Sequence, residues 1–240
     1  IFQNYLRCHD DIGWGLDYKF LGQFGSAEAP HKKYLNDWFT GKWYGSPARG
    51  ELYNDSEWMQ DARLCGTTAS LCGMESALYE NNEEALTRAI DADVMLHACM
   101  LTLRGIPVFY SGDELGMLND YGYHDDPGRQ ADSRNIHRGK MDWEKAEDRF
   151  DESTPTGRLF NEIKKLVMIR KYNDVFHSDA HVYPVDTGDN RVLGIIREYD
   201  GKRMIGLFNF SPDHAWAEVD GTGYQMKPYG FRWMLNVFVD

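Results

Sequence analysis

The segment 82–105 constrains the fold most, because its second half is apolar nearly all round. It opens with Asn82-Glu83-Glu84, a capping residue followed by two acids, which favours a helix N-terminus. Gly105 follows the segment's last apolar residue, as is typical of a helix end. The apolar residues are Val94, Met95, Leu96, Ala98, Met100, Leu101 and Leu103. A helix without a polar face must be covered on all sides, so the segment predicts a buried helix.

Two short β-rich runs, 1–6 and 106–110, precede and follow this helix. Strand, helix and strand in this order predict a parallel α/β unit. Polar side chains come after each strand: His9, Asp10 and Asp11 after the first, Asp113 and Glu114 after the second. In parallel α/β barrels the active site lies at the C-terminal ends of the strands, so we expect these side chains on one rim. Asp113 and Glu114 are assigned to loop structure, because adjacent residues of an extended segment point to opposite faces.

Between the first strand and the helix lies a long region, about 12–80, that is rich in Gly, aromatic and polar residues. Short helical patches are expected around 31–40 and 66–78. Insertions of this length in compact domains usually have local structure or a function, so we predict a loop subdomain.

The C-terminal part changes character. An amphipathic helix is expected at about 156–171, with Leu159, Ile163, Leu166, Val167 and Arg170 on one stripe. From 180 onward, β-type runs alternate with Asp-Gly, Gly-Asp and Ser-Pro turn signals, which predicts a small antiparallel β domain. The runs are 181–183, 191–199, 204–210, 215–219 and 231–239. We place one domain at 1–172 and the second at 173–240.

Charge and hydropathy argue against two classes of partner. The net charge is −12 and no block of Lys or Arg occurs, so no nucleic acid partner is expected. No apolar run approaches the roughly 18 residues that a membrane helix needs, so no membrane partner is expected.

The cysteines and the first residues bear on localisation. Cys8, Cys65, Cys72 and Cys99 show no CxxC spacing, so we expect buried thiols in a reducing compartment, which favours the cytoplasm. The chain begins directly in a strand-like run, so we also expect an upstream part. Secretion therefore stays open.

Five stretches together resemble one enzyme family. They are YLRCHDDIGW (5–14), GSPARG (45–50), ARLCGT (62–67), GIPVFYSGDELGMLND (105–120) and Asp132-Ser133-Arg134 with His137-Arg138. The first resembles the last catalytic motif of the α-amylase superfamily, glycoside hydrolase family 13, and the fourth resembles that family's eighth barrel strand and its loop. The other three are similar to amylosucrase and related sucrose-acting members.

The resemblance implies the C-terminal portion of a (β/α)8 TIM barrel, strands seven and eight with their helices, followed by a small antiparallel all-β domain C. The family's nucleophilic Asp and general-acid Glu lie on earlier strands, and neither motif occurs here. The chain alone is therefore expected to be inactive, with the missing N-terminal part of the same enzyme as its partner. The implied activity is retaining glucosyl transfer or hydrolysis on sucrose or an α-glucan. No cofactor and no metal is implied.

The resemblance also assigns roles to five residues. Asp10 is the implied transition-state stabiliser, and His9 would donate a hydrogen bond to a hydroxyl of the same sugar ring. Asp11 and Arg63 would face the leaving group or the acceptor, and Arg134 would pair with an upstream acid at the pocket floor. Simpler roles stay open: a His-Asp pair at a strand end, a surface arginine at 63 and a structural salt bridge at 134.

Other functions stay open as well. An α-glucosidase or amylase-type hydrolase without a preference for sucrose is the nearest alternative, and hydrolysis, transfer, phosphorolysis and isomerisation share this scaffold. A noncatalytic carbohydrate-binding module is a third interpretation, in which aromatic side chains of the long loop stack on sugar rings; packing in a core would explain them equally. These side chains are Trp14, Trp38, Trp43, Tyr44 and Trp58. Only Lys32 or Lys33 stands where the family has an acceptor-side arginine, so the acceptor is not predicted.

Overall fold

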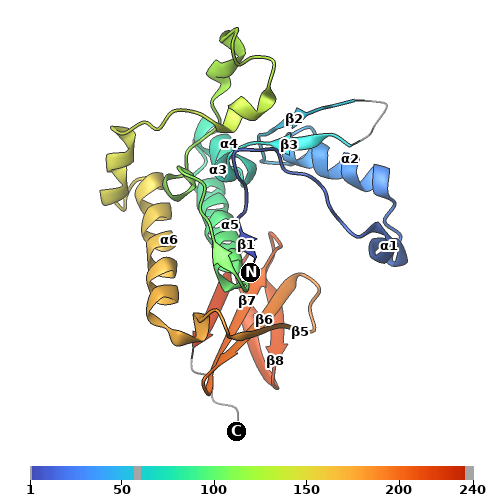
Figure 1. Ribbon diagram of the computed structural model, residues 1–240, viewed down its shortest axis with the longest axis vertical. Helices are drawn as coiled ribbons and strands as arrows, with labels where there is room; N and C mark the ends of the chain where they lie inside the picture. Colours follow the sequence, from blue (N-terminus) through green and yellow to red (C-terminus); the bar gives the residue numbers. More distant parts are fainter. Residues whose placement is uncertain (1, 57–60, 236–240) are drawn as a thin grey trace. The chain divides into compact units, whose positions relative to one another are not determined.

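The computed structural model describes residues 2–56 and 61–235 (Figure 1). The chain divides into two compact units. The first unit comprises Ile1–Leu6, Ile90–Phe109 and Asp148–Asp240, and the second comprises Arg7–Ala89 and Tyr110–Glu147. Each unit is assembled from segments far apart in the sequence, so long-range packing defines both. The domain division at 172/173 stays a prediction.

In the first unit, the two expected strands pair in parallel as β1 (Gln3–Asn4) and β4 (Ile106–Pro107). Both are shorter than the runs in the sequence. Pro107 has no amide hydrogen, and the amides of Ile106 and Val108 on either side donate to carbonyls of the β1 segment at 2.9 and 2.8 Å. The parallel pairing of the two strands is therefore confirmed.

Helix α5 (Glu83–Thr102) is the predicted helix, and it ends close to the expected residue. Gly105 has a φ of +132°, and a Cβ at this position would lie 2.6 Å from the carbonyl oxygen of Phe2. Only glycine combines this backbone conformation with so close an approach. The chain can therefore turn from the helix directly into β4.

Helix α6 (Pro155–Tyr172) follows the amphipathic pattern at 156–171. Its stripe is buried at Leu159, Ile163 and Leu166. Val167 is 38% exposed, because the residue after Leu166 lies about 100° further round the helix. The helix is confirmed, with a narrower apolar face than the sequence suggests.

The antiparallel β region is confirmed beyond residue 180. Four strands form a sheet in the order β10-β7-β6-β5, and β8 and β9 form a separate hairpin. The strands are β5 (His181–Val185), β6 (Val192–Tyr199), β7 (Lys202–Asn209), β8 (Ala215–Val219), β9 (Thr222–Met226) and β10 (Phe231–Leu235). Their common core contains Val192, Ile196, Ile205, Leu207, Ala215, Ala217, Val219 and Met226.

Two parts of this β region differ from the expectation, strand β9 and the last predicted run. Strand β9 is not among the predicted runs, because its Thr, Gly and Gln residues hide the alternation that marks a half-buried strand. The last predicted run extends to 239, and its residues 236–239 lie outside the described residues.

The second unit contains the long region after β1. Its predicted helical patches are confirmed, and two strands form an antiparallel hairpin. The helices are α1 (Tyr18–Leu21), α2 (Glu28–Phe39), α3 (Thr68–Leu71) and α4 (Met74–Tyr79), and the strands are β2 (Glu51–Tyr53) and β3 (Arg63–Cys65). The 3-10 turns η1 (Gly22–Phe24), η2 (Asp113–Leu115), η3 (Tyr121–Asp125) and η4 (Ser133–His137) complete the unit. The turns η5 (Lys145–Phe150) and η6 (Asp174–Phe176) flank α6.

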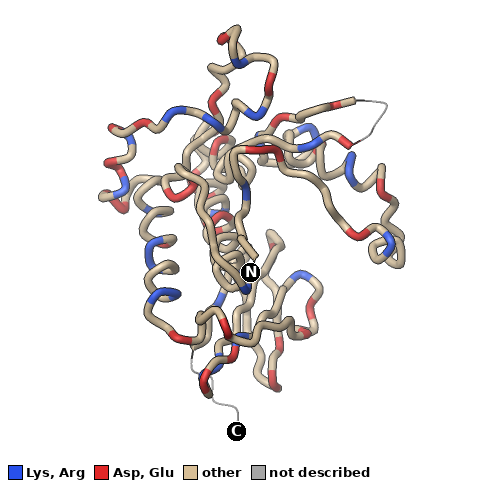
Figure 2. The backbone as a smooth tube through the Cα atoms, in the orientation of Figure 1, with Lys and Arg blue, Asp and Glu red and all other residues tan. Residues whose placement is uncertain are grey.

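Acidic and basic residues are interspersed along the chain, with acids in excess (Figure 2). Within the described residues, no helix has the length and apolar character needed to cross a membrane. None of the four cysteines, all of which are described, forms a disulfide. Cys65 is buried as expected, but Cys8, Cys72 and Cys99 are only half-buried.

Candidate functional site

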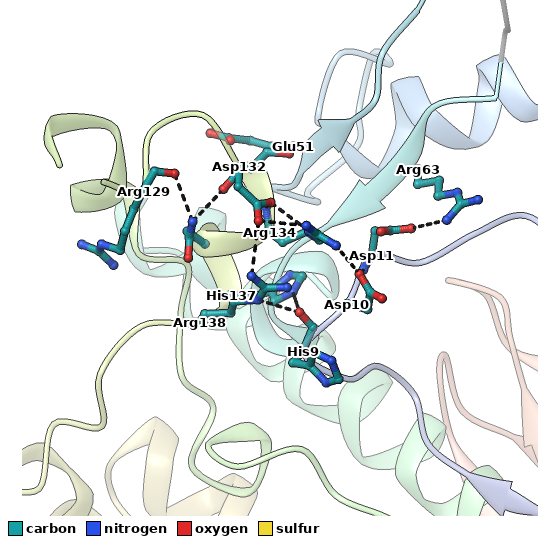
Figure 3. Close-up of polar contacts among 12 residues, drawn as sticks. His9, Asp10, Asp11, Glu51, Arg63, Arg129, Asp132, Arg134, His137 and Arg138 are labelled. Atoms are coloured by element: carbon teal, nitrogen blue, oxygen red, sulfur yellow. Dashed lines mark hydrogen bonds and ion pairs between the residues drawn. The ribbon is translucent and has the colours of Figure 1, made fainter. Parts of the chain in front are cut away.

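Four of the five predicted site residues are joined by hydrogen bonds in the second unit (Figure 3). His9, Asp10 and Asp11 lie in the segment that follows β1, Arg63 is the first residue of β3, and Arg134 lies in η4. The sequence separation between these segments is large, so the tertiary fold brings the side chains together.

Asp132 holds Arg134 in place from within the same turn. The Asp132 carboxylate accepts hydrogen bonds from the Arg134 amide at 3.0 Å, from Nε at 2.8 Å and from Nη2 at 3.0 Å. The guanidinium also lies over the ring of Tyr53, with Cζ 4.4 Å from the ring centroid. Its remaining nitrogen, Nη1, donates to Oδ1 of Asp10 at 2.8 Å. The planar, permanently charged guanidinium of Arg134 thus presents one hydrogen-bond donor to Asp10 in a fixed direction.

These contacts keep Asp10 ionised. The hydrogen bond from Arg134, with the backbone amide of Asp11, lowers the pKa of Asp10 to about 2. The same guanidinium lowers the pKa of Asp132. At neutral pH the site therefore presents a carboxylate that can accept hydrogen bonds from sugar hydroxyls and stabilise nearby positive charge.

Asp11 and Arg63 form a second pair beside the first. Arg63 Nη1 lies 3.2 Å from Asp11 Oδ2, and the Asp11 side chain is 5% exposed while that of Arg63 is 50% exposed. Arg63 also lines a polar hollow of about 390 Å³. The other lining residues are Asn54, Asp55, Ser56 and Asp61. The exposed guanidinium is therefore available to a bound ligand, while Asp11 anchors it.

His9 contributes to the site through its backbone. Its carbonyl oxygen accepts a hydrogen bond from Arg138 Nε at 2.7 Å and lies 3.3 Å from Nε2 of His137. The side chain of His9 is exposed. The contact of this side chain with a sugar ring, which the family resemblance implies, stays a prediction. The upstream acid expected for Arg134 also stays a prediction, and the partners of Arg134 in this chain are Asp132 and Asp10.

A buried ion pair joins Arg7, which the sequence analysis does not single out, to Asp113, which it assigns to loop structure. Arg7 Nη2 lies 2.7 Å from Asp113 Oδ1, and both side chains are 2% exposed. Asp113 lies in the short 3-10 turn η2, in agreement with its assignment to loop structure, and its side chain is part of a buried ion pair. Glu114 accepts a hydrogen bond from the amide of Gly112 at 2.9 Å, as a local turn residue does. The signal available in advance is an arginine two residues before His9, in an otherwise apolar run.

The aromatic residues of the long region divide into packed and exposed groups. Trp14 stacks on Phe39 with 5.6 Å between ring centroids, and its Nε1 donates to Asn36 Oδ1 at 2.7 Å, so it packs in the unit. Tyr44, in contrast, is 99% exposed. Trp58 lies outside the described residues. Among the residues described, no group of three or more His, Cys, Asp or Glu side chains is arranged to hold a metal ion.

No protein-family model matches the chain. The curated proteins that are similar in sequence include two enzymes. Glucosylglycerate phosphorylase of Escherichia coli is 30% identical over 174 residues, which cover 63% of this chain and 30% of that enzyme. Cyclomaltodextrinase of Thermoanaerobacter pseudethanolicus is 37% identical over 112 residues, which cover 46% of this chain and 16% of that enzyme. Both relatives are enzymes of glycoside hydrolase family 13. The chain is therefore similar in sequence to enzymes of the α-amylase superfamily.

A solved α-amylase superfamily structure shares the fold. Sucrose 6F-phosphate phosphorylase from Thermoanaerobacter thermosaccharolyticum superposes with a TM-score of 0.61 at 18% identity, over 94% of this chain and 40% of that one. In the comparison with the two curated enzymes, the matched part of this chain spans less than a third of the length of each enzyme. This partial coverage fits the C-terminal part that the motifs imply.

Proposed function

We propose that this chain is the C-terminal part of a retaining α-glucoside-acting enzyme, and that sucrose is the substrate whose glucosyl unit it transfers or hydrolyses. The parallel pair β1 and β4 would be barrel strands seven and eight, and the sheet of β5, β6, β7 and β10 with the β8–β9 hairpin would be domain C. The observation that carries the proposal is the Arg134 guanidinium, which joins Asp132 to Asp10 beside the Asp11–Arg63 pair.

The chemistry follows from an ionised, oriented Asp10. In a retaining reaction one carboxylate attacks the anomeric carbon and a carboxylic acid about 5 Å away protonates the leaving oxygen. Both groups would come from the N-terminal part of the enzyme, which is the proposed partner. Asp10 would accept hydrogen bonds from ring hydroxyls next to the reacting carbon, and these bonds strengthen as the ring gains positive charge.

The second ion pair is proposed to face the group that leaves or accepts the glucosyl unit. Arg63 presents an exposed guanidinium to the polar hollow, and Asp11 holds its position. A guanidinium in a hollow lined by polar groups suits a hydroxylated or anionic molecule. The relative named as a phosphorylase makes inorganic phosphate an acceptor to be tested beside water and glucan.

A hydrolase without a preference for sucrose is the second candidate, because one relative is named cyclomaltodextrinase. The two candidates differ in the products that they release. Fructose release from sucrose, compared with glucose release from maltose, separates them, and added phosphate reveals phosphorolysis as glucose 1-phosphate.

The test begins with the mass of the native protein before and after denaturation, since the proposal requires an additional segment or subunit that completes the barrel. The same material is then assayed on sucrose and maltose. In the active protein, Asp10→Asn should lower kcat by about 100-fold or more. Its thermal unfolding should change little, because half of the Asp10 side chain is exposed. Asp125→Asn, at an exposed position of the same unit, is the matched control. Turnover that persists in the Asp10 variant would overturn the proposal.

A further inference from the structure

The imidazole of His137 contacts two backbone groups of different segments, Gly66 and His9. Figure 3 shows the contact with His9. The amide of Gly66, directly after β3, donates to His137 Nδ1 at 3.0 Å. On the other side, Nε2 lies 3.3 Å from the carbonyl oxygen of His9. An amide N–H can only donate and a carbonyl oxygen can only accept. Nδ1 therefore carries no proton, and Nε2 carries the proton that bonds His9.

The surroundings maintain this neutral tautomer. Burial, and next the charge of Arg7, lower the pKa of His137 to about 4. Arg138 adds to the positive charge on this side, while Asp10 acts in the opposite direction. The imidazole is thus neutral at physiological pH, with one acceptor and one donor in fixed positions.

The contact is part of a reciprocal brace between two chain segments. His137 and Arg138 both donate to the carbonyl of His9, while Arg7 Nη1 donates to the carbonyl of His137 at 3.4 Å. Each segment therefore holds the backbone of the other. Because the peptide unit is planar, the direction of the His9 carbonyl also constrains the backbone of Asp10.

We propose that His137 is a positioning residue that orients the Asp10 carboxylate by holding the carbonyl of His9, while Arg134 holds the carboxylate itself. The catalytic consequence rests on the proposed function, whereas the positioning rests on the contacts alone. If His137 had a purely structural role, its hydrogen bonds to Gly66 and to His9 would matter equally. The test must therefore remove one of these two bonds at a time.

Two amide side chains separate them. In His137→Asn the amide oxygen can take the place of Nδ1 and keep the Gly66 bond, but the side chain is too short to reach His9. In His137→Gln the terminal amide can take the place of Nε2 and keep the His9 bond, and the Gly66 bond is lost. His124→Asn and His124→Gln are matched controls, because His124 is a half-exposed histidine of the same unit.

Backbone hydrogen exchange is the first readout, and it needs no substrate. In His137→Asn the amides of Asp10 and Asp11 should exchange at least about tenfold faster than in the wild type, while the amide of Gly66 exchanges at the wild-type rate. In His137→Gln the amide of Gly66 should exchange faster, while the amides of Asp10 and Asp11 keep their wild-type rates. The inference would be overturned if both variants exchanged the amides of Gly66, Asp10 and Asp11 equally faster than the wild type. It would also be overturned if neither variant changed any of these exchange rates.

Turnover is the second readout, measured on the complete active enzyme. His137→Asn should lower kcat by about 10- to 100-fold with little change in KM, because a small misplacement of a group at the reacting carbon is costly. His137→Gln should lower kcat much less, although it lowers Tm at least as much. A kcat that follows Tm in both variants contradicts the positioning role. A wild-type enzyme that turns over no α-glucoside contradicts the proposed function, and hydrogen exchange then still decides the role of His137.

Discussion

Arg134 Nη1 donates a hydrogen bond of 2.8 Å to Oδ1 of Asp10, a residue 124 positions earlier in the chain. The rest of the guanidinium is held by Asp132, two residues before it. A local turn thus orients the arginine, and the arginine orients a distant carboxylate. The electrostatics of Asp10 depend on this long-range contact.

The first prediction concerns the ionisation of Asp10. In Arg134→Leu the pKa of Asp10 should rise from about 2 toward its usual value of 3.8, because the hydrogen bond from Arg134 is the largest cause of the lowering. An NMR titration of the carboxyl carbon measures it. Since folding lowers this pKa, ionised Asp10 stabilises the folded state above pH 3.8, by a small amount because half of its side chain is exposed, and that contribution disappears as the pH falls toward 2. Arg129→Leu, in the same unit, should leave the titration unchanged, and an unchanged value in Arg134→Leu would refute the assignment.

The second prediction concerns the buried pair of Arg7 and Asp113. Arg7→Met should reduce the free energy of unfolding by about 3–5 kcal/mol, because it leaves a buried carboxylate without this counter-charge. The control Lys33→Met removes an exposed pair with Asp37 and should cost less than about 1 kcal/mol. Urea denaturation measures both. The double variant Arg7→Met/Asp113→Leu should recover part of the lost free energy of unfolding, because it no longer buries an unpaired carboxylate. If Arg7→Met and Lys33→Met lost the same free energy of unfolding, the buried pair would have no special importance for stability.

The third prediction concerns Arg197 of β6, which is almost fully buried. Its guanidinium donates to the carbonyls of Thr102, Val175 and His177 at 2.8, 2.9 and 3.1 Å, so it covers the end of α5. Burial lowers its pKa to about 10. Arg197→Lys should destabilise the protein by about 2–3 kcal/mol, because an ammonium cannot reach three divergent carbonyls.

Thermal unfolding of Arg197→Lys tests this, with the exposed Arg191→Lys as the control. The control should change stability by less than about 0.5 kcal/mol. If both variants unfold at the same temperature, the carbonyls of Thr102, Val175 and His177 have other sources of stabilisation.

The fourth prediction concerns acid stability. Folding lowers the pKa of His137 from 6.5 to about 4, so the unfolded chain binds more protons between these values. Stability therefore falls as the pH drops from 6.5 to 4, by up to about 3 kcal/mol from this residue. Urea midpoints at pH 7 and pH 4.5 should differ less in His137→Gln than in the wild type. A pH dependence identical in the two proteins would show that His137 does not titrate in this way.

The sequence predicted those elements that follow from local pattern. The buried helix α5, the amphipathic helix α6 and five of the β strands after residue 180 occur near their expected positions, because apolar periodicity and turn residues act over short distances. Strand β9 was missed where Gly and polar residues conceal the alternation.

The site was only partly predictable for the same reason. The residue types of Asp10, Asp11, Arg63 and Arg134 mark them as candidates, and the motif resemblance groups them. The sequence marks Arg7 and places His137 in a motif, but the contact of His137 with Gly66 and the burial of Arg7 with Asp113 could not be deduced from it. Their partners lie 71 and 106 positions away.

The sequence by itself therefore determined most of the secondary structure, the set of chemically capable side chains and the resemblance to the α-amylase superfamily. Tertiary structure decided which of these side chains meet: Asp10 with Arg134, Asp11 with Arg63, and the carbonyl of His9 with His137 and Arg138. The physical reason is distance. Hydrogen bonds and ion pairs act over about 3 Å, and only the folded backbone brings segments that are far apart in sequence so close together.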